Sequence, residues 1–260
     1  IGRTAGGGLR MFGKNKKSNT DNSAGRIIDE NTSFETVETY KTIRTNIMFS
    51  MPKSKSGKVI VVTGSMPSEG KTTTAINLAI TFAQMGAKVL LADCDLRKPR
   101  IHRYLGIEKE DGVSNILCGF CDAQSAIKKN VRENLDCLTS GGTPPNPAEL
   151  LESDEFTELL AQLKESYDYI FIDTPPTTVV TDAAIIFAQC SGVVVVIRQN
   201  ITSFDLLDVT MDTISKANAK ALGFVVLGTD EKRGKYYGKG KYGYRYKYSY
   251  RPYAEGGETK

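Results

Sequence analysis

The chain has 260 residues, of which 40% are hydrophobic and 25% are charged, and its formal net charge is +4. This apolar content suffices for a buried core, and no apolar run reaches the roughly 20 residues that a membrane-spanning helix needs. The single histidine, His102, argues against a histidine-based triad or metal cluster. Five cysteines without framework spacing favour reduced thiols, and no secretory leader is recognisable, so we expect a cytoplasmic protein.

The net charge is divided unevenly along the chain. Residues 1–17 carry five basic side chains and residues 232–253 carry eight, and neither stretch contains an acidic one. The remaining residues therefore sum to −9. An acidic body with two basic ends is the result, and such ends bind anionic surfaces or stay solvated.

The N-terminal segment contains little that could pack. Residues 1–10, IGRTAGGGLR, are typical of an expression-vector remnant, so we take Met11 as the native start and leave these ten residues out of the fold. Residues 11–31 are mostly polar, and we expect a flexible segment there.

The first helix is expected from about residue 33 to 50. Thr32 and Glu35 fit a capping box, and the apolar residues that follow recur at helical spacing. Pro52 marks its end.

Short β-branched runs then alternate with helical patterns. Five continuous apolar runs are typical of strands buried on both faces of a parallel sheet, and we expect these strands at 58–64, 88–95, 169–176, 193–198 and 222–228. A weaker strand is expected at 134–141, and helical periodicity marks 71–86, 154–166 and 203–218. The sequence therefore predicts a doubly wound α/β domain with a mostly parallel sheet over residues 32–230.

The stretch TGSMPSEGKTTTA follows the first expected strand and opens a helix, which is the context of a phosphate-binding loop. Gly70 allows close approach of the backbone to phosphate, Lys71 can bridge two phosphates, and the Thr72 hydroxyl can bind Mg²⁺. The strict GxxxxGK[ST] pattern has glycine where this chain has Ser65. The expected nucleotide-binding residues are Ser65, Pro67, Ser68, Glu69, Gly70, Lys71, Thr72 and Thr73. The sequence thus predicts a P-loop NTPase that binds ATP.

Aspartates follow two other expected strands, at the sheet edge where α/β proteins bind ligands. Asp173 occupies a Walker B position, and Asp93 and Asp95 would share one face of a continuing strand. Such carboxylates stay ionised together only beside a cation, which Mg²⁺ supplies. We expect Thr72, Asp95 and Asp173 to hold Mg²⁺ and Lys71, Asp93 and Asp95 to act in catalysis. The alternative is that the aspartates only cap helices.

These motifs resemble those of the bacterial tyrosine kinases of the capsule and exopolysaccharide type, the BY-kinases. Residues 65–72, 90–95 and 170–173 are similar to the family's Walker A, Walker A′ and Walker B motifs, and residues 141–153 resemble a loop-and-helix segment of the family. The related cell-division and plasmid-partition ATPases carry a second lysine early in the loop, where this chain has Met66. That difference and the tyrosine-rich end favour the kinase.

The resemblance also implies a subunit contact on the first helix. The family's ExxRxxR motif corresponds here to Glu38, Lys41 and Arg44, so lysine replaces the middle arginine and the bidentate fork is lost. Spacing of three places these side chains on adjoining turns. A ring-like homo-oligomer is implied, and an ordinary solvated helix face is the alternative.

Residues 231–260 form a basic tail with a cluster of tyrosines and no aliphatic side chain between 236 and 253. Ordering these eighteen residues would cost about 20–35 kcal/mol of backbone entropy, so we expect a flexible tail whose positive charge favours docking on the acidic body. An edge strand or a nucleic-acid-binding tail are the alternatives. We expect phosphorylation at Tyr236, Tyr237, Tyr242, Tyr244, Tyr246, Tyr248, Tyr250 and Tyr253.

The expected reaction is transfer of the γ-phosphoryl group of Mg·ATP to a tail tyrosine of a neighbouring subunit. A phenol with a pKa near 10 needs a base at pH 7, and Asp93 is the candidate by resemblance and position. The resemblance also implies control of capsular or exopolysaccharide synthesis and export, a tyrosine phosphatase partner, and a separate membrane adaptor that activates the kinase at the inner face of the cell membrane. No nucleic acid partner is expected.

Two other functions fit parts of the sequence. A partition-type ATPase would hydrolyse ATP without modifying protein, and a nucleotide-dependent scaffold would bind an anionic polymer through its tail. Incubation with γ-labelled ATP separates the three functions. The label appears on tyrosine for the kinase, only in released phosphate for the ATPase, and in neither for the scaffold.

Overall fold

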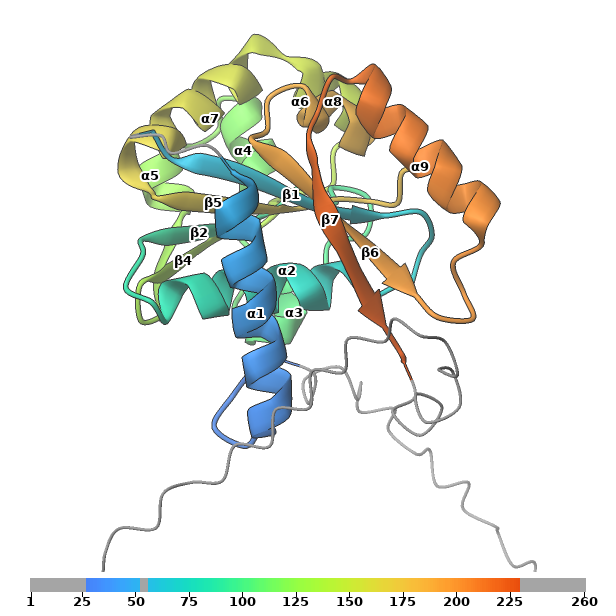
Figure 1. The fold of residues 1–260 in the computed structure, drawn as a ribbon. Coiled ribbons are helices and arrows are strands. Elements are labelled where there is room, and N and C mark those ends of the chain that lie inside the picture. Colours follow the sequence, from blue (N-terminus) through green and yellow to red (C-terminus); the bar gives the residue numbers. More distant parts are fainter. Residues whose placement is uncertain (1–26, 52–55, 230–260) are drawn as a thin grey trace, which may run out of the picture. The chain divides into compact units, whose positions relative to one another are not determined.

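The computed structural model describes residues 27–51 and 56–229 (Figure 1). The expected vector remnant, most of the N-terminal segment and the tyrosine cluster lie outside the described residues. The elements are α1 (Phe34–Ser50), β1 (Lys58–Gly64), α2 (Lys71–Ala83), β2 (Val89–Asp93), α3 (Ile101–Leu105), α4 (Val113–Leu117), α5 (Ala123–Ala126), β3 (Lys128–Arg132), β4 (Leu135–Leu138), α6 (Pro147–Glu152), α7 (Asp154–Ser166), β5 (Tyr169–Asp173), α8 (Asp182–Phe187), β6 (Gly192–Arg198), α9 (Phe204–Lys216) and β7 (Ala221–Leu227).

Within the described residues, seven strands form one sheet in the order β3-β4-β2-β5-β1-β6-β7. All neighbouring strands run parallel except β3, which is antiparallel to β4. Figure 1 shows α1 and α2 on one face of the sheet and α7, α8 and α9 on the other. The predicted doubly wound α/β fold is therefore confirmed.

The interior strand β1 shows why two separate core layers form. Val59 and Val61 point into the core beneath α7 and α8, whereas Ile60 and Val62 point into the core beneath α1 and α2. Successive side chains of a strand alternate between faces, so a continuous apolar run supplies both layers. The ring of Phe82 on α2 packs edge-on against Phe171 of β5, with the centroids 5.0 Å apart. Helix α2, which begins at the phosphate loop, is thereby fixed to the sheet.

Two strands differ from the expectation. β7 was predicted to be buried on both faces, but Phe224 and Val226 are half-exposed because β7 lies at the sheet edge with one face incompletely covered. The antiparallel strand β3 was not predicted, because its sequence KKNVR is polar. Its neighbourhood is held by polar contacts, since Lys129 Nζ donates to Asp136 Oδ2 at 3.0 Å.

The expected cap of the first helix is wrong by one residue. Ser33 is the N-cap of α1, and its hydroxyl accepts from the backbone N–H of Thr36 at 3.3 Å. The Thr32 hydroxyl instead donates to Asp29 Oδ1 at 3.0 Å, and Glu35 lies in the first turn. The Thr32 side chain therefore forms its hydrogen bond within a local turn and does not cap α1.

The segment expected to be flexible does not extend to residue 31. Ile27 and Ile28 are buried in the core layer beneath α1 and α2. The backbone N–H of Ile28 donates to Asn77 Oδ1 at 2.9 Å, and its carbonyl accepts from Arg132 Nη1 at 2.7 Å. Among the described residues, the packed part of the domain therefore includes this apolar pair.

We predict that Phe82→Ala destabilises the domain by about 3–5 kcal/mol, because a fully buried ring that anchors α2 to β5 is lost. Urea unfolding followed by circular dichroism measures the loss. Phe204→Ala removes an exposed ring and is the matched control, with an expected change within about 0.5 kcal/mol. Equal effects of the two substitutions would contradict this description of the core.

Candidate active site

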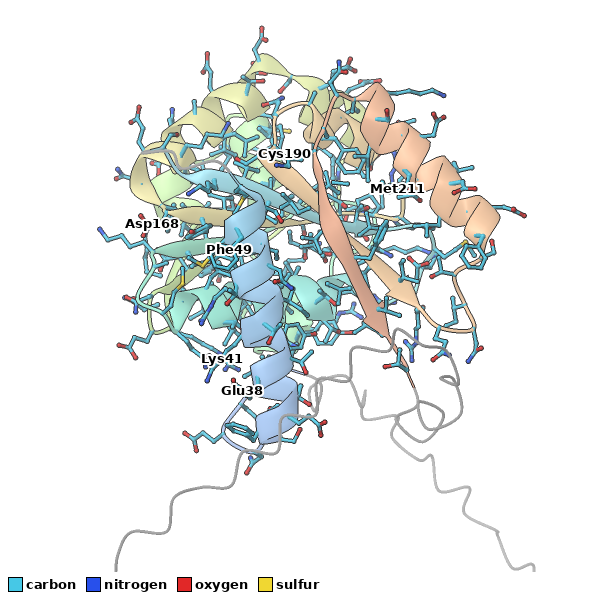
Figure 2. The ribbon with its side chains drawn as sticks, in the orientation of Figure 1. Glu38, Lys41, Phe49, Asp168, Cys190 and Met211 are labelled. Atoms are coloured by element: carbon cyan, nitrogen blue, oxygen red, sulfur yellow. The ribbon has the colours of Figure 1, made fainter. Side chains whose placement is uncertain are left out.

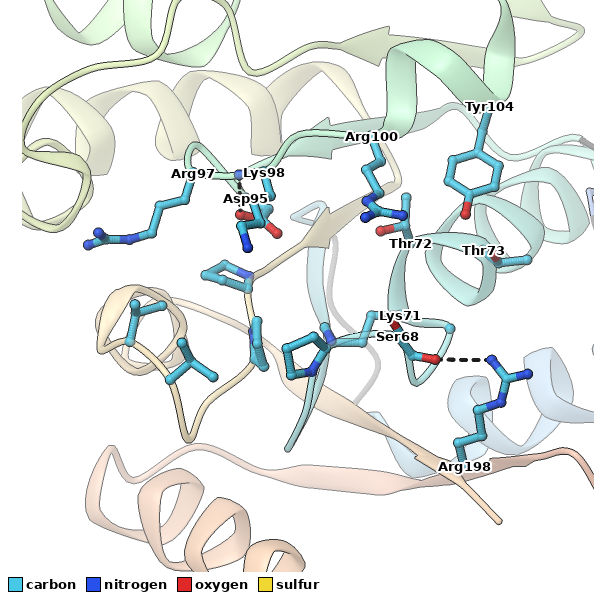
Figure 3. Close-up of a pocket in the computed structure, with 16 residues that line it drawn as sticks. Ser68, Lys71, Thr72, Thr73, Asp95, Arg97, Lys98, Arg100, Tyr104 and Arg198 are labelled. Carbon is cyan, nitrogen blue, oxygen red and sulfur yellow. Dashed lines mark hydrogen bonds between the residues drawn. The ribbon is translucent and has the colours of Figure 1, made fainter. Parts of the chain in front are cut away.

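A cavity of about 500 Å³ opens where four parallel strands end (Figure 3). Its walls come from the loop and helix after β1, the segments after β2 and β5, and Arg198 at the end of β6. The carboxyl ends of β1, β2, β5 and β6 lie at one edge of the sheet because these strands are parallel. The cavity thus lies at the edge where α/β sheets bind ligands.

The phosphate loop, residues 65–70, connects β1 to α2. Ser68 and Gly70 have φ angles of 66° and 101°, a left-handed conformation that glycine adopts without strain. The first N–H groups of α2 have no intrahelical carbonyl partners, so the helix start favours an anion. Pro67, Ser68, Gly70, Lys71, Thr72 and Thr73 all line the cavity. The structure therefore gathers six of the eight expected nucleotide-binding residues there.

The amine of Lys71 is close to the phosphate loop itself. Its Nζ donates to the Met66 carbonyl at 2.7 Å, and the side chain is largely buried. Burial lowers the pKa of Lys71, whereas the nearby charges of Asp173, Glu69 and Asp95 raise it. The amine of Lys71 therefore experiences the charges of three carboxylates at the start of α2.

The side chains of Ser65 and Glu69 are not directed into the cavity, and contact of these two residues with a nucleotide remains a prediction. Both are fully buried and neither lines the cavity. The Ser65 hydroxyl lies 2.8 Å from the Thr210 hydroxyl of α9, which in turn lies 2.8 Å from the hydroxyl of Thr177. This buried contact between the phosphate loop and α9 explains why serine can replace the glycine of the strict motif.

Asp93 and Asp173 form a carboxylate pair on neighbouring strands. They are in register between β2 and β5 and are almost completely buried. Burial raises the pKa of Asp173 to about 7, and burial together with the Asp173 charge raises the pKa of Asp93 well above its usual range. Each carboxylate has one oxygen, Oδ1, without a hydrogen-bond partner among the described residues. Such unpartnered buried oxygens fit a site for a cation.

Asp93 and Asp95 do not share a strand face, because β2 ends at Asp93. Asp93 Oδ2 accepts from the backbone N–H groups of Arg100 and Ile101, each at 3.1 Å, and Asp93 does not line the cavity. Asp95 does line it, and its Oδ1 accepts from the N–H of Lys98 at 2.9 Å. The expected shared face is therefore wrong, and the two carboxylates have different surroundings.

The donor set fits Mg²⁺ bound together with phosphates. In the described ranges, no group of three or more His, Cys, Asp or Glu side chains could hold a metal. Mg²⁺ keeps several waters and needs one or two carboxylates besides phosphate oxygens. Thr72 and Asp95 line the cavity, and the Thr72 side chain lowers the pKa of Asp173. These three residues are the expected metal ligands, and their chemistry suits that ion.

Cations also line the cavity, and sequence analysis did not identify them. They are Arg97, Lys98, Arg100 and Arg198. Arg97 forms a bidentate pair with the buried Asp182, with N···O distances of 2.8 and 2.9 Å. Arg198 Nη1 donates to the Ser68 carbonyl at 3.0 Å (Figure 3). These residues follow or end strands whose carboxyl ends lie at the ligand-binding edge of the sheet. That position in the sequence could have identified them.

The expected oligomer motif is partly engaged within the chain. Glu38 and Lys41 lie beside each other on α1 and form an ion pair of 2.7 Å (Figure 2). Arg44 Nη1 donates to the Thr81 carbonyl of α2 at 2.7 Å. The arginine therefore contacts its own domain, and a subunit contact through this motif remains a prediction.

Comparison with known proteins agrees with the site. A family model described as an AAA domain matches residues 57–222. The tyrosine-protein kinase YwqD of Bacillus subtilis is 39% identical over 79% of this chain and 86% of its own length. The tyrosine-protein kinase wzc of Salmonella typhimurium is 35% identical over 73% of this chain, but this match spans 26% of that protein.

Solved structures give the same relationship. The kinase domain of the Escherichia coli tyrosine kinase ETK has a TM-score of 0.72 and 30% identity, covering 81% of this chain and 80% of that chain. The cell division ATPase MinD of Pyrococcus furiosus has a TM-score of 0.58 and 25% identity, covering 68% of this chain and 75% of that chain. This chain therefore belongs to the bacterial tyrosine-protein kinases, whose P-loop domain is related to the MinD-type ATPases.

Proposed function

We propose that this kinase transfers the γ-phosphoryl group of Mg·ATP to the tyrosines of its own C-terminal cluster, residues 236–253, on a neighbouring subunit. The observation that carries the proposal is the cavity that combines a phosphate loop, a buried carboxylate pair and several cations. The cluster begins nine residues after the end of β7, a length of chain that can extend about 30 Å. Such a reach permits a tyrosine to enter an active site.

The residues of the phosphate loop bind and orient the nucleotide. The N–H groups at the start of α2 and the Lys71 amine lie where they can stabilise charge that develops on the transferred group. Thr72, Asp95 and Asp173 would hold Mg²⁺, which neutralises phosphate charge when it is bound. A related protein supports this proposal, since the septum site-determining protein MinD of Pyrococcus horikoshii forms a complex with Mg-ADP.

A carboxylate accepts the proton of the phenol. Asp93 has a raised pKa and an unpartnered Oδ1, which are properties of a general base. Asp93 is fully buried and does not line the cavity, so a phenol reaches it only after a local rearrangement. Asp95, which already lines the cavity, is the alternative base.

The proposed cellular role is regulation of capsular or exopolysaccharide synthesis and export, which rests on family membership. The described residues contain no helix that is long and apolar enough to span a membrane. From family membership we also propose that a separate membrane adaptor brings the kinase to the inner face of the cell membrane. A ring-like homo-oligomer and an opposing tyrosine phosphatase complete the proposed system.

A second function is favoured by the similarity to MinD, which is a cell division ATPase. In that case the chain would hydrolyse ATP and release phosphate without modifying a tyrosine. Met66 replaces the second lysine expected of such ATPases, and this difference favours the kinase.

We predict that Lys71→Met abolishes tyrosine phosphorylation, because the amine next to the phosphate loop is lost. Incubation with γ-labelled ATP followed by phosphotyrosine analysis measures the effect, and circular dichroism reports on the fold. Lys216→Met at an exposed position of α9 is the matched control and retains activity. Undiminished phosphotyrosine in Lys71→Met would contradict the site, and release of phosphate without phosphotyrosine in the wild type would favour the ATPase.

We predict that Asp173→Asn stabilises the nucleotide-free protein at pH 8 and weakens binding of Mg·ADP. The folded pKa of Asp173 is about 7, above its value in an unfolded chain, so the folded state binds more protons between about pH 4 and pH 7. The free energy of unfolding therefore falls as the pH rises through this window, and asparagine removes that contribution.

Urea unfolding at pH 5 and pH 8 measures this difference. Asp212→Asn, at an exposed position on α9, is the matched control. If Asp173→Asn kept the wild-type pH dependence of the free energy of unfolding, the pKa of Asp173 would not be raised in the folded protein.

A further inference from the structure

Glu69 is a carboxylate inside the phosphate loop that the nucleotide-binding role does not explain. Its side chain is fully buried, and it does not line the cavity. Burial of a carboxylate is unfavourable unless its oxygens are hydrogen-bonded. Its position therefore requires a partner for each oxygen.

Both oxygens of Glu69 have such partners. Oε2 accepts from the backbone N–H of Met66 at 2.9 Å, and Oε1 accepts from the Thr202 hydroxyl in the turn between β6 and α9. The Thr202 hydroxyl in turn accepts from the backbone N–H of Arg198 at 3.0 Å. A Cβ atom at Gly64 would collide with Oε2, so a glycine at this position leaves the space that the carboxylate fills.

These contacts fix the phosphate loop from both sides. The Met66 peptide is held at its N–H by Glu69 and at its carbonyl by Lys71 Nζ, 2.7 Å away. Arg198 adds a second connection from the same turn, because its Nη1 donates to the Ser68 carbonyl at 3.0 Å. The loop is thus attached to residues 198–202 by two contacts, one between Glu69 and Thr202 and one between the Arg198 side chain and the Ser68 carbonyl.

We propose that Glu69 is a positioning residue that clamps the phosphate loop to the turn at residues 198–202 and so presents the loop amides and Lys71 to the nucleotide phosphates. Glu69 itself does not touch the nucleotide. This inference rests on the proposed nucleotide binding and adds a role for a residue that lies behind the binding surface. It also makes Thr202, which is outside the cavity lining, part of the same arrangement.

A carboxylate suits this position better than an amide of the same size. Glu69 offers two acceptor oxygens to two donors, the Met66 N–H and the Thr202 hydroxyl. Glutamine offers one acceptor oxygen and one NH₂ group. The NH₂ group would have to face either the Met66 N–H or the Thr202 hydroxyl, so one of these two donors would lose its acceptor. Glu69→Gln therefore tests the contact with almost no change in volume.

The experiment measures the affinity of the full chain for a fluorescent ADP analogue with Mg²⁺. Glu69→Gln and Thr202→Val are each expected to raise the dissociation constant about tenfold, because mispositioned amides lose charge-assisted hydrogen bonds to phosphate. Thr202→Ser keeps the hydroxyl and is expected to restore wild-type affinity. Thr213→Val, which removes a hydroxyl bonded within α9, is the matched control and leaves the affinity unchanged.

A double variant decides whether the two residues act through one contact. If they do, Glu69→Gln with Thr202→Val is no weaker than the weaker single variant, because the same clamp is lost once. If the two increases in the dissociation constant multiply in the double variant, the proposal is overturned, and Glu69 acts on the nucleotide separately from Thr202. A lower melting temperature with unchanged affinity would also overturn it, since the carboxylate would then be only structural.

The affinity measurement is independent of the kinase reaction. A wild-type protein that binds the ADP analogue but forms no phosphotyrosine would contradict the proposed function and leave the clamp testable. A wild-type protein that binds no nucleotide would overturn both proposals.

Discussion

The site depends on one electrostatic constraint, which is the burial of Asp93 and Asp173 side by side at the ends of two parallel strands. Without a compensating cation, two such carboxylates repel each other and resist ionisation, so their pKa values are raised. Lys71 offsets part of this repulsion, but burial lowers the pKa of Lys71 itself. Protonation or a bound cation would each relieve this repulsion, and the Mg²⁺ proposed above would couple the relief to nucleotide binding.

The parallel sheet brings the parts of this arrangement together. The phosphate loop, Asp95, the segment after Asp173 and Arg198 are far apart in sequence, yet each follows a strand whose carboxyl end lies at the same edge. Packing of Phe82 against β5 fixes α2, and the clamp through Glu69 fixes the loop that precedes it. Chemistry at this edge therefore depends on contacts in the core and behind the loop.

Patterns in the sequence were sufficient to predict an element or a site wherever a single physical cause determined it. Continuous apolar runs predicted β1 because both faces of that strand are buried, and the glycine and lysine of the loop predicted the phosphate site. Prediction failed where several polar contacts compete. β3 is polar, Thr32 bonds to Asp29 instead of capping α1, and the direction of the Glu69 side chain depends on Thr202, which lies 133 residues away.

The charge of the cavity also limits how the tail can be recognised. Attraction between the basic tail and an acidic body was expected from the sequence, but Arg97, Lys98, Arg100 and Arg198 line the cavity. Arg97 is neutralised by Asp182, whereas the other three add positive charge around the phosphate site. Bound nucleotide phosphates would reverse the sign of this region, because they bring negative charge between those cations. Under the proposed function, attraction of a basic tyrosine segment into the cavity would therefore require the nucleotide first.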